Sequence, residues 1–510
     1  MNPSGIFLPD WLARCAENLP EHLAVQCDQV QWSFAELDRQ ATKLARQLAA
    51  IGVQEGNRVA LLAASGLPYV AFVHALVRLG AILVPLNLRL TLEELCWQVR
   101  DVHASLLVCD ADYASLAHEI GRAVPQLPLA TLATGSKGGE TVLSELPEND
   151  APLRTLIDLG APQAILYTSG TTGQPKGAII TYGMQWWNAV GSALNLGHSP
   201  DDRWLACLPL FHIGGLSILM RSIIYGISVV VHKKFDPFIV NHAIYEDKIT
   251  IISVVAVMLQ RMLAALDTGG RGAGYPSTLR CVLLGGGPVP YPLLEACMLR
   301  NIPVVQTYGL TEACSQAVTL SPADAMRKPG SAGRPLPPVQ LRIMRDNSSA
   351  SPGEPGEIFL KGPTITPGYV DRPEATAQAF QDGWFATGDI GYLDKDGYLY
   401  VLDRRADLII CGGENVYPAE IESVLLSHPG IVEAGVCGQA DAQWGQVPVA
   451  FVVLKAGSTA SAGELLDYLA QKLARYKLPR AFYFTGHLPR TSSGKLLRRE
   501  LPRLLQTPYK

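Results

Sequence analysis

A loop rich in hydroxyl groups and glycines follows a short apolar run in this sequence. It spans residues 167–177 and reads YTSGTTGQPKG. Glycines let backbone N–H groups approach phosphate oxygens, and hydroxyl and ammonium groups donate hydrogen bonds to the same oxygens. The side chains of this kind are Ser169, Thr171, Thr172 and Lys176. The pattern predicts a phosphate-binding loop, and the alternative is a plain solvent-exposed loop.

This loop is not a Walker A motif. That motif needs Ser or Thr directly after its lysine, whereas Gly177 follows Lys176 here and Pro175 precedes it. A switch GTPase or an ATPase motor is therefore disfavoured, and the phosphate chemistry is expected to be of another kind.

Two further apolar runs end in loops suited to a ligand. Residues 278–288, TLRCVLLGGGP, end in glycines, and residues 303–313, PVVQTYGLTEA, end in a polar turn. A GGGP turn alone is weak evidence. Open α/β sheets bind ligands beyond the carboxyl ends of their strands, so we expect these loops and the phosphate loop to form one site.

The elements around these loops follow an α/β pattern. Between residues 58 and 110 the apolar runs RVALLA, AILVPLN and SLLVCD alternate with helix-like stretches such as LTLEELCWQVRDV. This alternation of strands and helices (βαβ) is typical of a parallel sheet. After Gly330, segments punctuated by Gly and Pro predict hairpins and small sheets. We place the main domain boundary near residues 403–407, which predicts an N-terminal domain over 1–403 and a smaller α+β domain over 404–510.

Composition excludes several classes of protein. A chain of 510 residues with 48% hydrophobic and 17% charged residues predicts a compact protein of more than one domain. The net charge of -4 disfavours nucleic-acid binding. The charged residues in the first 20 positions argue against a secretory signal, and no apolar run reaches the length of a membrane span. The ten cysteines form no C-x-x-C pair, so neither a zinc site nor a disulfide framework is predicted. A cytoplasmic protein fits best, and a homo-oligomer stays open.

Four motifs occur in the order found in adenylate-forming enzymes. They are YTSGTTGQPKG, YGLTEA, GWFATGDIGYLDKDGYLYVLDRRADLIICGGEN and PRTSSGKLLRRE. The chain therefore resembles, over essentially its whole length, the superfamily of acyl-CoA synthetases, luciferases and peptide-synthetase adenylation domains. The resemblance implies a large N-terminal domain of parallel and mixed sheets with helices and a small β subdomain, and a small mobile C-terminal domain. It also implies ATP, Mg²⁺ and coenzyme A as reactants or cofactors.

The resemblance assigns expected roles to residues of the N-terminal domain. Glu312 matches the magnesium ligand, and Thr311 matches the residue that bonds the α-phosphate; the alternative for Glu312 is a carboxylate at a helix start. Asp389 matches the aspartate that accepts hydrogen bonds from both ribose hydroxyls, and Arg404 matches the arginine that assists it, with a structural salt bridge as the alternative. The other expected nucleotide contacts are Thr168, Ser169, Gly170, Thr171, Thr172, Lys176, Gly286, Gly287, Tyr308 and Gly309, with the Tyr308 ring stacked on adenine.

The C-terminal segment is expected to bring two further groups to the site. Lys495 resembles the mobile lysine that stabilises the transition state of adenylation; without the resemblance it reads as a surface charge. Gly412 and Gly413 resemble the loop that lets the arm of coenzyme A pass after a domain rotation, and a simple turn is the alternative. The sequence departs from the pattern at the hinge, where many relatives have Asp or Lys at the position of Ala406.

The residues of the segment between the phosphate loop and GGGP indicate which carboxylic acid is activated. LPLFHIGGLSILMRSIIYG and LLGGGPVPYPLLEAC resemble the o-succinylbenzoate-CoA ligases of menaquinone biosynthesis, which activate one carboxyl group of an aromatic dicarboxylate. His212 and Arg221 are the candidates for the unreacted carboxylate, with Gly286 beside the substrate. They would flank one pocket if Gly214 and Gly215 formed a turn between them. Alternatively, His212 only shapes the pocket and Arg221 pairs with a nearby acid.

Other functions stay open at this point. Another aryl or fatty acyl-CoA ligase would use the same chemistry on a different acid. An enzyme that loads a carrier protein, or a luciferase-like oxygenase, would share only the first step. A nucleotide-binding protein without catalysis is disfavoured because Lys176, Glu312 and Lys495 are all present.

Overall fold

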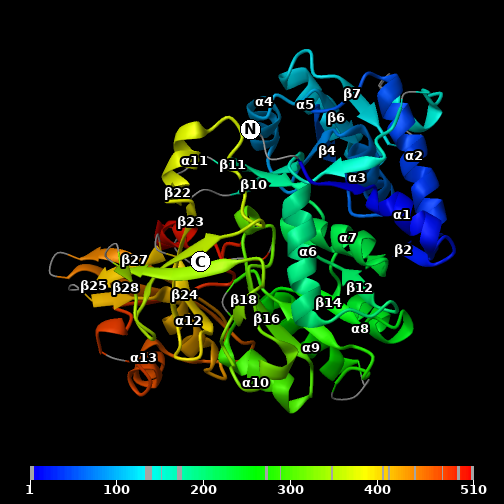
Figure 1. Ribbon diagram of the computed structural model, residues 1–510. Helices are drawn as coiled ribbons and strands as arrows, with labels where there is room; N and C mark the ends of the chain where they lie inside the picture. The colour runs from blue at the N-terminus through cyan, green and yellow to red at the C-terminus, as the bar shows by residue number, and fades with distance from the viewer. Residues whose placement is uncertain are drawn as a thin grey trace.

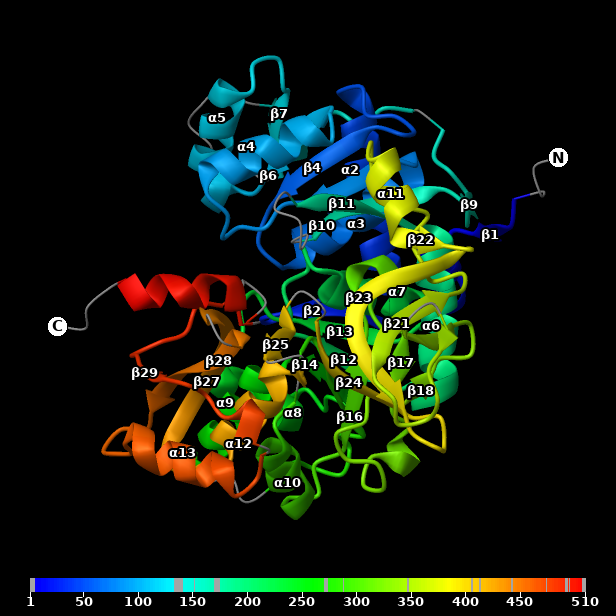
Figure 2. The ribbon, with the colours of Figure 1, turned by 90° about the vertical axis from the view of Figure 1, so that its left-hand side faces the viewer.

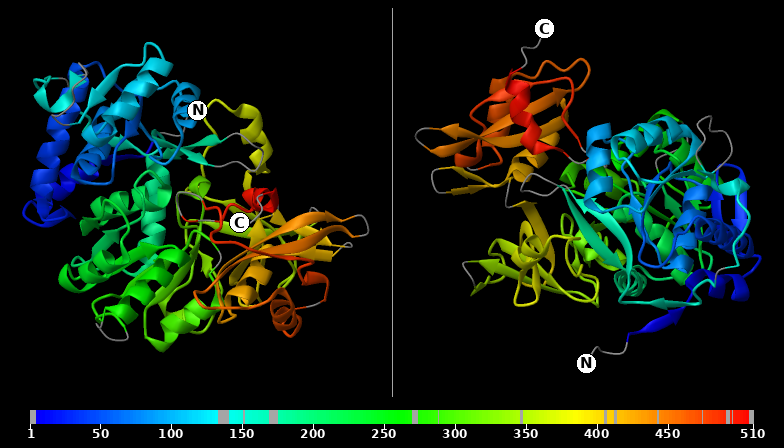
Figure 3. Two further views of the ribbon diagram at one scale, coloured as in Figure 1. Left: turned by 180° about the vertical axis from the view of Figure 1, so that it is seen from behind. Right: turned by 90° about the horizontal axis from the view of Figure 1, so that it is seen from above.

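The structure is a computed structural model in which a large N-terminal part carries a smaller C-terminal part on one side (Figures 1 and 3). It describes residues 5–132, 141–150, 152–168, 175–269, 274–287, 289–345, 348–404, 407–411, 414–441, 444–473, 475–490, 494 and 496–506. In that part of the chain, no helix has the length and apolar character needed to cross a membrane. All ten cysteines are free thiols.

The first large sheet has the strand order β11-β10-β5-β4-β6-β7-β8. The strands from β10 to β8 run parallel, and β11 pairs antiparallel with β10. The predicted βαβ rhythm is therefore confirmed. The strands are β4 (Arg58–Leu62), β5 (Ile82–Pro85), β6 (Leu106–Cys109), β7 (Leu129–Thr131), β8 (Thr141–Val142), β10 (Pro162–Thr168) and β11 (Lys176–Thr181).

The connecting helices of this sheet begin and end at local sequence signals. Thr91 and Glu94 form a capping box at the start of α4 (Leu92–Asp101), which satisfies backbone N–H groups of its first turn. Gly80 ends α3 (Leu67–Leu79) in the left-handed conformation at φ 66°, which costs a glycine little. The other helices here are α2 (Phe34–Ala50) and α5 (Ala114–Ala123).

The second large sheet has the order β18-β17-β16-β15-β14-β12-β13-β2-β3. Its middle strands run parallel and are almost wholly apolar, because both faces of the sheet are covered. The strands are β2 (Leu23–Cys27), β3 (Val30–Ser33), β12 (Arg203–Ala206), β13 (Ser228–Val231), β14 (Ile251–Val254), β15 (Cys281–Leu284), β16 (Val304–Tyr308), β17 (Val318–Thr319) and β18 (Arg334–Pro335). The helices are α6 (Tyr182–Leu196), α7 (Ile213–Tyr225), α8 (Pro237–Glu246), α9 (Ala256–Thr268) and α10 (Tyr291–Leu299).

The main hydrophobic core lies between these two sheets. It joins residues of both sheets with the inner faces of α2, α3, α6 and α7, and α1 (Trp11–Asn18) closes its outer side. A short pair of strands, β1 (Phe7–Pro9) and β9 (Leu156–Asp158), lies beside α1. Because one core joins both sheets, the ends of their strands keep a fixed relation to each other.

A smaller antiparallel sheet follows the second large sheet, as the Gly- and Pro-rich pattern after Gly330 predicted. It has the order β20-β19-β21-β23-β22, and β24 pairs with β23. Figure 2 labels β21, β22, β23 and β24 of this sheet. The β23–β24 hairpin turns at Gly397, whose φ of 79° is accessible to glycine without strain. The elements are β19 (Gln340–Arg345), β20 (Ser348–Ser349), β21 (Gly356–Lys361), α11 (Pro373–Ala379), β22 (Phe380–Gln381), β23 (Trp384–Leu393) and β24 (Leu399–Arg404).

The C-terminal part, residues 409–506, has its own sheet and its own core clusters. Its strand order is β26-β25-β28-β27, with β29 beside β28. The change of sheet falls between Arg404 and Ile409, and the exact boundary after residue 403 stays a prediction. The elements are β25 (Ile409–Cys411), β26 (Glu414–Val416), α12 (Pro418–Leu426), β27 (Ile431–Asp441), β28 (Gly445–Leu454), α13 (Ala462–Ala470) and β29 (Phe482–Phe484), followed by a 3₁₀ helix over Arg498–Gln506.

Candidate active site

The predicted phosphate loop joins the two antiparallel strands β10 and β11. Thr168 ends β10 and faces Lys176, which begins β11. The hairpin therefore holds both ends of the loop together at the carboxyl end of β10. Ser169, Gly170, Thr171 and Thr172 lie outside the described residues.

Glu312 meets the end of this hairpin, although it comes from the other large sheet. The Thr168 hydroxyl donates to Oε1 of Glu312 over 3.4 Å, and the Tyr369 hydroxyl donates to the same oxygen over 3.0 Å. The side chain of Glu312 is buried. The structure thus brings the ends of strands β10 and β16 together, although the strands belong to different sheets.

The loop after β16 presents Glu312 by folding back on itself. Its 3₁₀ turn covers Thr311–Ala313, and the N–H of Ala317 donates to the carbonyl of Tyr308 over 3.0 Å. Gly309 is required where the loop closes, because a Cβ there would lie 1.5 Å from the carbonyl oxygen of Ser315. Thr311 begins the turn and directly precedes Glu312, which contacts Thr168 of the hairpin.

The end of β15 lies next to the end of β16. A Cβ at Gly285 would lie 2.7 Å from Cγ2 of Thr307, so only glycine lets the two strand ends approach this closely. Gly286 has a φ of 85°, and a Cβ at Gly287 would meet nothing within 4 Å. The backbone at Gly287 therefore borders open space, whereas Gly285 is packed against Thr307.

Tyr308 and Asp389, both predicted nucleotide contacts, lie side by side. The Tyr308 hydroxyl donates to Oδ2 of Asp389 over 2.7 Å. Asp389 is paired in register with Arg404 across the β23–β24 hairpin, which places Arg404 at the same level of the sheet. The side chain of Arg404 lies outside what the structure describes.

The glycines between His212 and Arg221 do not form a turn, so the condition under which the sequence would place these two residues around one pocket is not met. Gly214 and Gly215 lie within the first turn of α7, which runs without interruption from Ile213 to Tyr225. Gly215 serves close packing there, because a Cβ would lie 2.3 Å from the carbonyl oxygen of Pro209. His212 occupies the N-cap position of the helix without a capping hydrogen bond from its side chain, and Arg221 lies in the last turns, about 13 Å further along the axis.

Arg221 is deeply buried, with 2% of its surface exposed. Nη2 donates to Oδ1 of Asn188, and the guanidinium lies over the ring of Trp204 at 5.4 Å from the centroid. Nε has no hydrogen-bond partner in the described residues, and no carboxylate there forms an ion pair with Arg221. Burial lowers the pKa of Arg221 from its ordinary value. The alternative that Arg221 pairs with a nearby acid is therefore not found in the described chain.

Asn188 connects Arg221 to the loop that carries Glu312. Its amide donates to the carbonyl of Gln316 over 2.6 Å and to the carbonyl of Ala313 over 3.4 Å. Burial raises the pKa of the Cys314 thiol to about 12, and the positive charge of Arg221 opposes this rise. Arg221 therefore lies behind the loop of residues 309–316 and is coupled to its backbone.

Lys495, Gly412, Gly413 and Ala406 lie outside the described residues, but the flanks of Lys495 are described. Arg490 donates to the carbonyl of Gly494 over 2.9 Å and pairs with Glu433 over 2.6 Å. A Cβ at Gly494 would lie 3.6 Å from Cγ2 of Val255, the residue that follows β14. The segment before Lys495 therefore touches the N-terminal part at the carboxyl end of its second sheet.

A second arginine forms ion pairs on the C-terminal side of Lys495. Arg498 pairs with Asp407 over 3.0 Å and with Glu422 over 2.7 Å. Glu422 in turn accepts a hydrogen bond from the N–H of Val436 over 2.8 Å. This network joins the region just after β24 to the C-terminal part as one body.

The described residues around Glu312 fit a magnesium–phosphate site. No group of three or more metal-binding side chains occurs in the described chain, so a cation here would need ligands from its substrate. Glu312 supplies one hard carboxylate oxygen, and Lys176 lies close by with Nζ 5.4 Å from the Tyr369 ring centroid. One carboxylate with several outside ligands is how Mg²⁺ is commonly held with phosphates.

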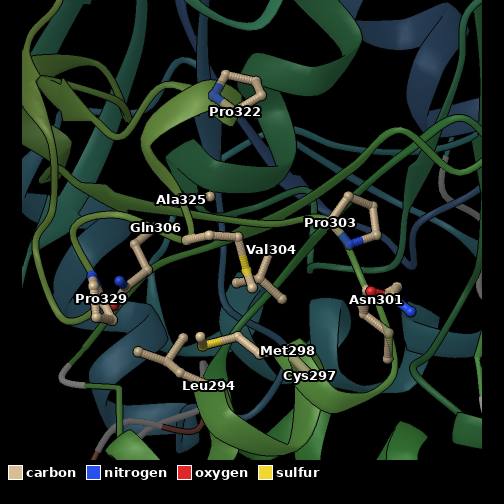
Figure 4. A pocket seen from close by; sticks show the side chains of 12 residues that line it. Leu294, Cys297, Met298, Asn301, Pro303, Val304, Gln306, Pro322, Ala325 and Pro329 are labelled. Atoms are coloured by element: carbon tan, nitrogen blue, oxygen red, sulfur yellow. The ribbon is translucent and has the colours of Figure 1, made fainter.

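A surface hollow of about 220 Å³ lies elsewhere, between α10 and the segment after β17. Figure 4 shows Pro322 and Ala325 across this hollow from Leu294 and Met298. None of the predicted site residues lines it. The hollow is therefore separate from the site at the strand ends.

Sequence reasoning missed Tyr369 and Asn188. Tyr369 lies in the run TPGYV, which was read only as part of a Gly- and Pro-rich hairpin region. Burial and the negative charge of Glu312 raise the pKa of Tyr369 above its ordinary value, so the hydroxyl remains a donor. Asn188 sits inside α6 among apolar residues, where a buried amide is a signal that a polar partner must be near.

Comparisons with known proteins match nearly the whole chain. The family model described as AMP-binding enzyme matches residues 12–370, and the one described as AMP-binding enzyme C-terminal domain matches residues 420–495. A 2-succinylbenzoate–CoA ligase from Geobacillus kaustophilus (strain HTA426) is 52% identical over 98% of each chain.

Solved structures of a Bacillus subtilis protein are also similar. Its o-succinylbenzoate CoA synthetase in complex with the acyl-adenylate intermediate has a TM-score of 0.90 at 42% identity, over 99% of each chain. The complex of that enzyme with ATP and magnesium ion has a TM-score of 0.90 at 43% identity, over 98% of this chain and 100% of the other.

Proposed function

This chain belongs to the family of AMP-binding enzymes, and from that premise we propose that it is an ATP-dependent 2-succinylbenzoate–CoA ligase. Relatives of 46–52% identity over almost the full length carry this name. The reaction has two steps, an acyl-adenylate with release of pyrophosphate and then a coenzyme A thioester with release of AMP. The product is an intermediate of menaquinone biosynthesis. The free cysteines fit a reducing compartment, so we place the enzyme in the cytoplasm.

The observation that carries the proposal is the meeting of the two sheets at Glu312. Thr168 and Glu312 lie in hydrogen-bond contact, and Lys176 is the neighbour of Thr168 across the hairpin. A hydroxyl, a carboxylate and an ammonium group therefore lie together at the end of this hairpin. A triphosphate needs such groups, because hydroxyl and ammonium donors bind its oxygens and a carboxylate binds its cation. Magnesium, held by Glu312 when bound, would neutralise charge on the phosphates.

In the first step, a carboxylate oxygen of the acid attacks the α-phosphorus of ATP, and the bond to pyrophosphate breaks. Negative charge grows on the phosphoryl oxygens, so fixed donors there lower the barrier. Thr311 and the phosphate loop are the proposed donors of the N-terminal part, and Lys495 is the proposed donor of the C-terminal part. Tyr308, Gly287 and Asp389 are proposed to hold the adenosine, with Arg404 beside Asp389.

In the second step, the thiol of coenzyme A attacks the acyl carbon, and AMP leaves with the bonding electrons. A free carboxylate is a poor electrophile, and AMP turns its oxygen into a leaving group. We propose that Gly412 and Gly413 line the path of the thiol after the C-terminal part rotates about a hinge at Ala406.

Arg221 is the proposed anchor for the second carboxylate of the substrate. A buried guanidinium without an acidic partner is costly, and a bound carboxylate would remove that cost. The planar fork of arginine suits a carboxylate better than a point charge does. His212, at the start of the same helix, and Gly286 remain proposed contacts of the acyl group.

The proposed function predicts a specific acid requirement. In a panel of aromatic and fatty acids, 2-succinylbenzoate should give by far the fastest AMP formation with ATP, Mg²⁺ and coenzyme A present. Without coenzyme A, pyrophosphate release should stop after about one turnover per site, because the adenylate stays bound. Equal rates with a fatty acid would point instead to a general acyl-CoA ligase.

Replacing Arg221 with glutamine should weaken the preference for the dicarboxylate. The ratio of kcat/KM for 2-succinylbenzoate to that for 4-oxo-4-phenylbutanoate, which lacks the ring carboxylate, should fall about 10- to 100-fold, as expected for a lost charge-assisted hydrogen bond. The ratio is measured within one variant, so it does not depend on the fraction of folded protein. An unchanged ratio would remove Arg221 from substrate recognition.

A further inference from the structure

Tyr369 contacts two charged groups of the proposed site. Its hydroxyl donates to Oε1 of Glu312 over 3.0 Å, and its ring lies 5.4 Å from Nζ of Lys176. We propose that Tyr369 is a positioning residue that orients the Glu312 carboxylate for the cation of the nucleotide complex. This inference rests on the proposed function and names a residue that acts on the cation through Glu312.

The backbone of Tyr369 is held by the strand that follows the phosphate loop. The N–H of Val370 donates to the carbonyl of Gly177 over 2.9 Å, and the N–H of Ile179 donates to the carbonyl of Gly368 over 3.1 Å. The N–H of Tyr369 itself donates to Oγ1 of Thr376 over 3.0 Å. The phenol therefore extends from a main chain that is fixed on both sides.

The same segment also holds the main chain of Glu312. The N–H of Thr366 donates to the carbonyl of Glu312 over 2.7 Å, and the Thr366 hydroxyl donates to the carbonyl of Ile179 over 2.7 Å. The segment 366–370 thus fixes Glu312 at its backbone and at its carboxylate. The two contacts together leave the side chain little rotational freedom.

The hydrogen bonds select one carboxylate oxygen. In the described residues, Tyr369 and Thr168 both donate to Oε1 of Glu312. Oε2 is then the oxygen left for a cation. A carboxylate that is oriented before the cation arrives loses less conformational entropy on binding, and removal of such outer partners of metal ligands costs about 10- to 100-fold in metal affinity or activity.

The test compares cation binding with nucleotide binding in Tyr369→Phe, which keeps the ring and removes only the hydroxyl. Binding of Mn²⁺ as a probe of the Mg²⁺ site is followed by electron paramagnetic resonance in the presence of α,β-methylene-ATP, which the enzyme cannot cleave. The Mn²⁺ concentration for half-saturation should rise about tenfold or more. The Kd for AMP, which needs no cation, should stay within about twofold of the parent value.

Tyr275→Phe is the matched control. Its hydroxyl donates to Oδ1 of Asn241 over 2.8 Å, in a core cluster that contains none of the proposed site residues. This variant loses a comparable tyrosine hydrogen bond and should bind both Mn²⁺ and AMP as the parent does. Thermal melting of both variants checks that each is folded under the conditions of the titration.

Two results would overturn the inference. Parental Mn²⁺ affinity in Tyr369→Phe would show that the hydroxyl does not orient Glu312. A parallel loss of Mn²⁺ and AMP affinity would show a purely structural role. If the parent protein itself bound the ATP analogue without any dependence on Mn²⁺, the proposed function would fail instead, so the two failures are distinguishable.

Discussion

Replacement of Lys495 by alanine should slow adenylate formation by a factor of about 10² to 10⁴, which corresponds to a loss of roughly 3 to 5 kcal/mol of transition-state stabilisation. The ammonium group is proposed to neutralise charge that grows on the phosphoryl oxygens during attack. The described flank supports its delivery, because Gly494 lies beside Val255 at the strand ends of the second sheet. Pyrophosphate release in a single turnover measures this step.

The second half-reaction separates a catalytic role from a structural one. Thioester formation from preformed acyl-adenylate and coenzyme A should proceed in Lys495→Ala at close to the parent rate, because no phosphoryl bond breaks. Lys455→Ala is the matched control, since Lys455 is an exposed lysine of the same C-terminal part, and it should leave both steps unchanged. Equal losses of both half-reactions in Lys495→Ala would indicate that the lysine is structural.

Glu312→Gln should lower kcat/KM for ATP about 100-fold or more in the adenylation step. Glutamine keeps the shape and can still accept from Tyr369 and Thr168, but it lacks the negative charge that a hard cation prefers. A loss of this size corresponds to about 3 kcal/mol, within the range expected when one charged contact of a phosphoryl transfer is removed. The rate should be measured over a range of Mg²⁺ concentrations, because the half-saturating concentration should rise as well.

The control for this variant is Glu354→Gln. Glu354 is exposed in the smaller antiparallel sheet region, where it accepts a hydrogen bond from the N–H of Ser351 over 3.0 Å. It should have parental kinetics. A Glu312→Gln enzyme with an unchanged Mg²⁺ dependence would contradict the assignment of Glu312 as the metal ligand. Binding of AMP should survive in Glu312→Gln, which separates loss of the cation from loss of the whole site.

Two arginines attach the segment around Lys495 to the C-terminal part. Arg490 and Arg498 each pair with a carboxylate of the C-terminal part, and Arg498 also reaches Asp407, just beyond β24. All three ion pairs are partly or largely buried, so each arginine is held more firmly than in an exposed ion pair. In the proposed rotation, the segment would therefore turn with the C-terminal part as one body.

Local features of the fold were accessible from the sequence. The alternation of apolar runs with helix-like stretches identified β4, β5 and β6 and the helix α4 between them, because strand and helix periods leave different patterns. The Gly and Pro signals after residue 330 identified the small antiparallel sheet for the same reason. Whether the glycines between His212 and Arg221 form a turn stayed open, because two glycines inside an apolar run are compatible with a turn or a helix until the packing of Gly215 against Pro209 is known.

The sequence by itself determined the types of chemical group and their order: hydroxyls and a lysine after β10, a carboxylate after β16, and an aspartate in β23. The type and order of these groups can be read directly from the residues of each short segment. Only the tertiary structure decided that β10 and β16 belong to different sheets and still meet at Glu312, and that Tyr369 completes the contact. Such contacts join residues 57 to 144 positions apart, and they depend on how one shared core packs two sheets together, which no local pattern encodes.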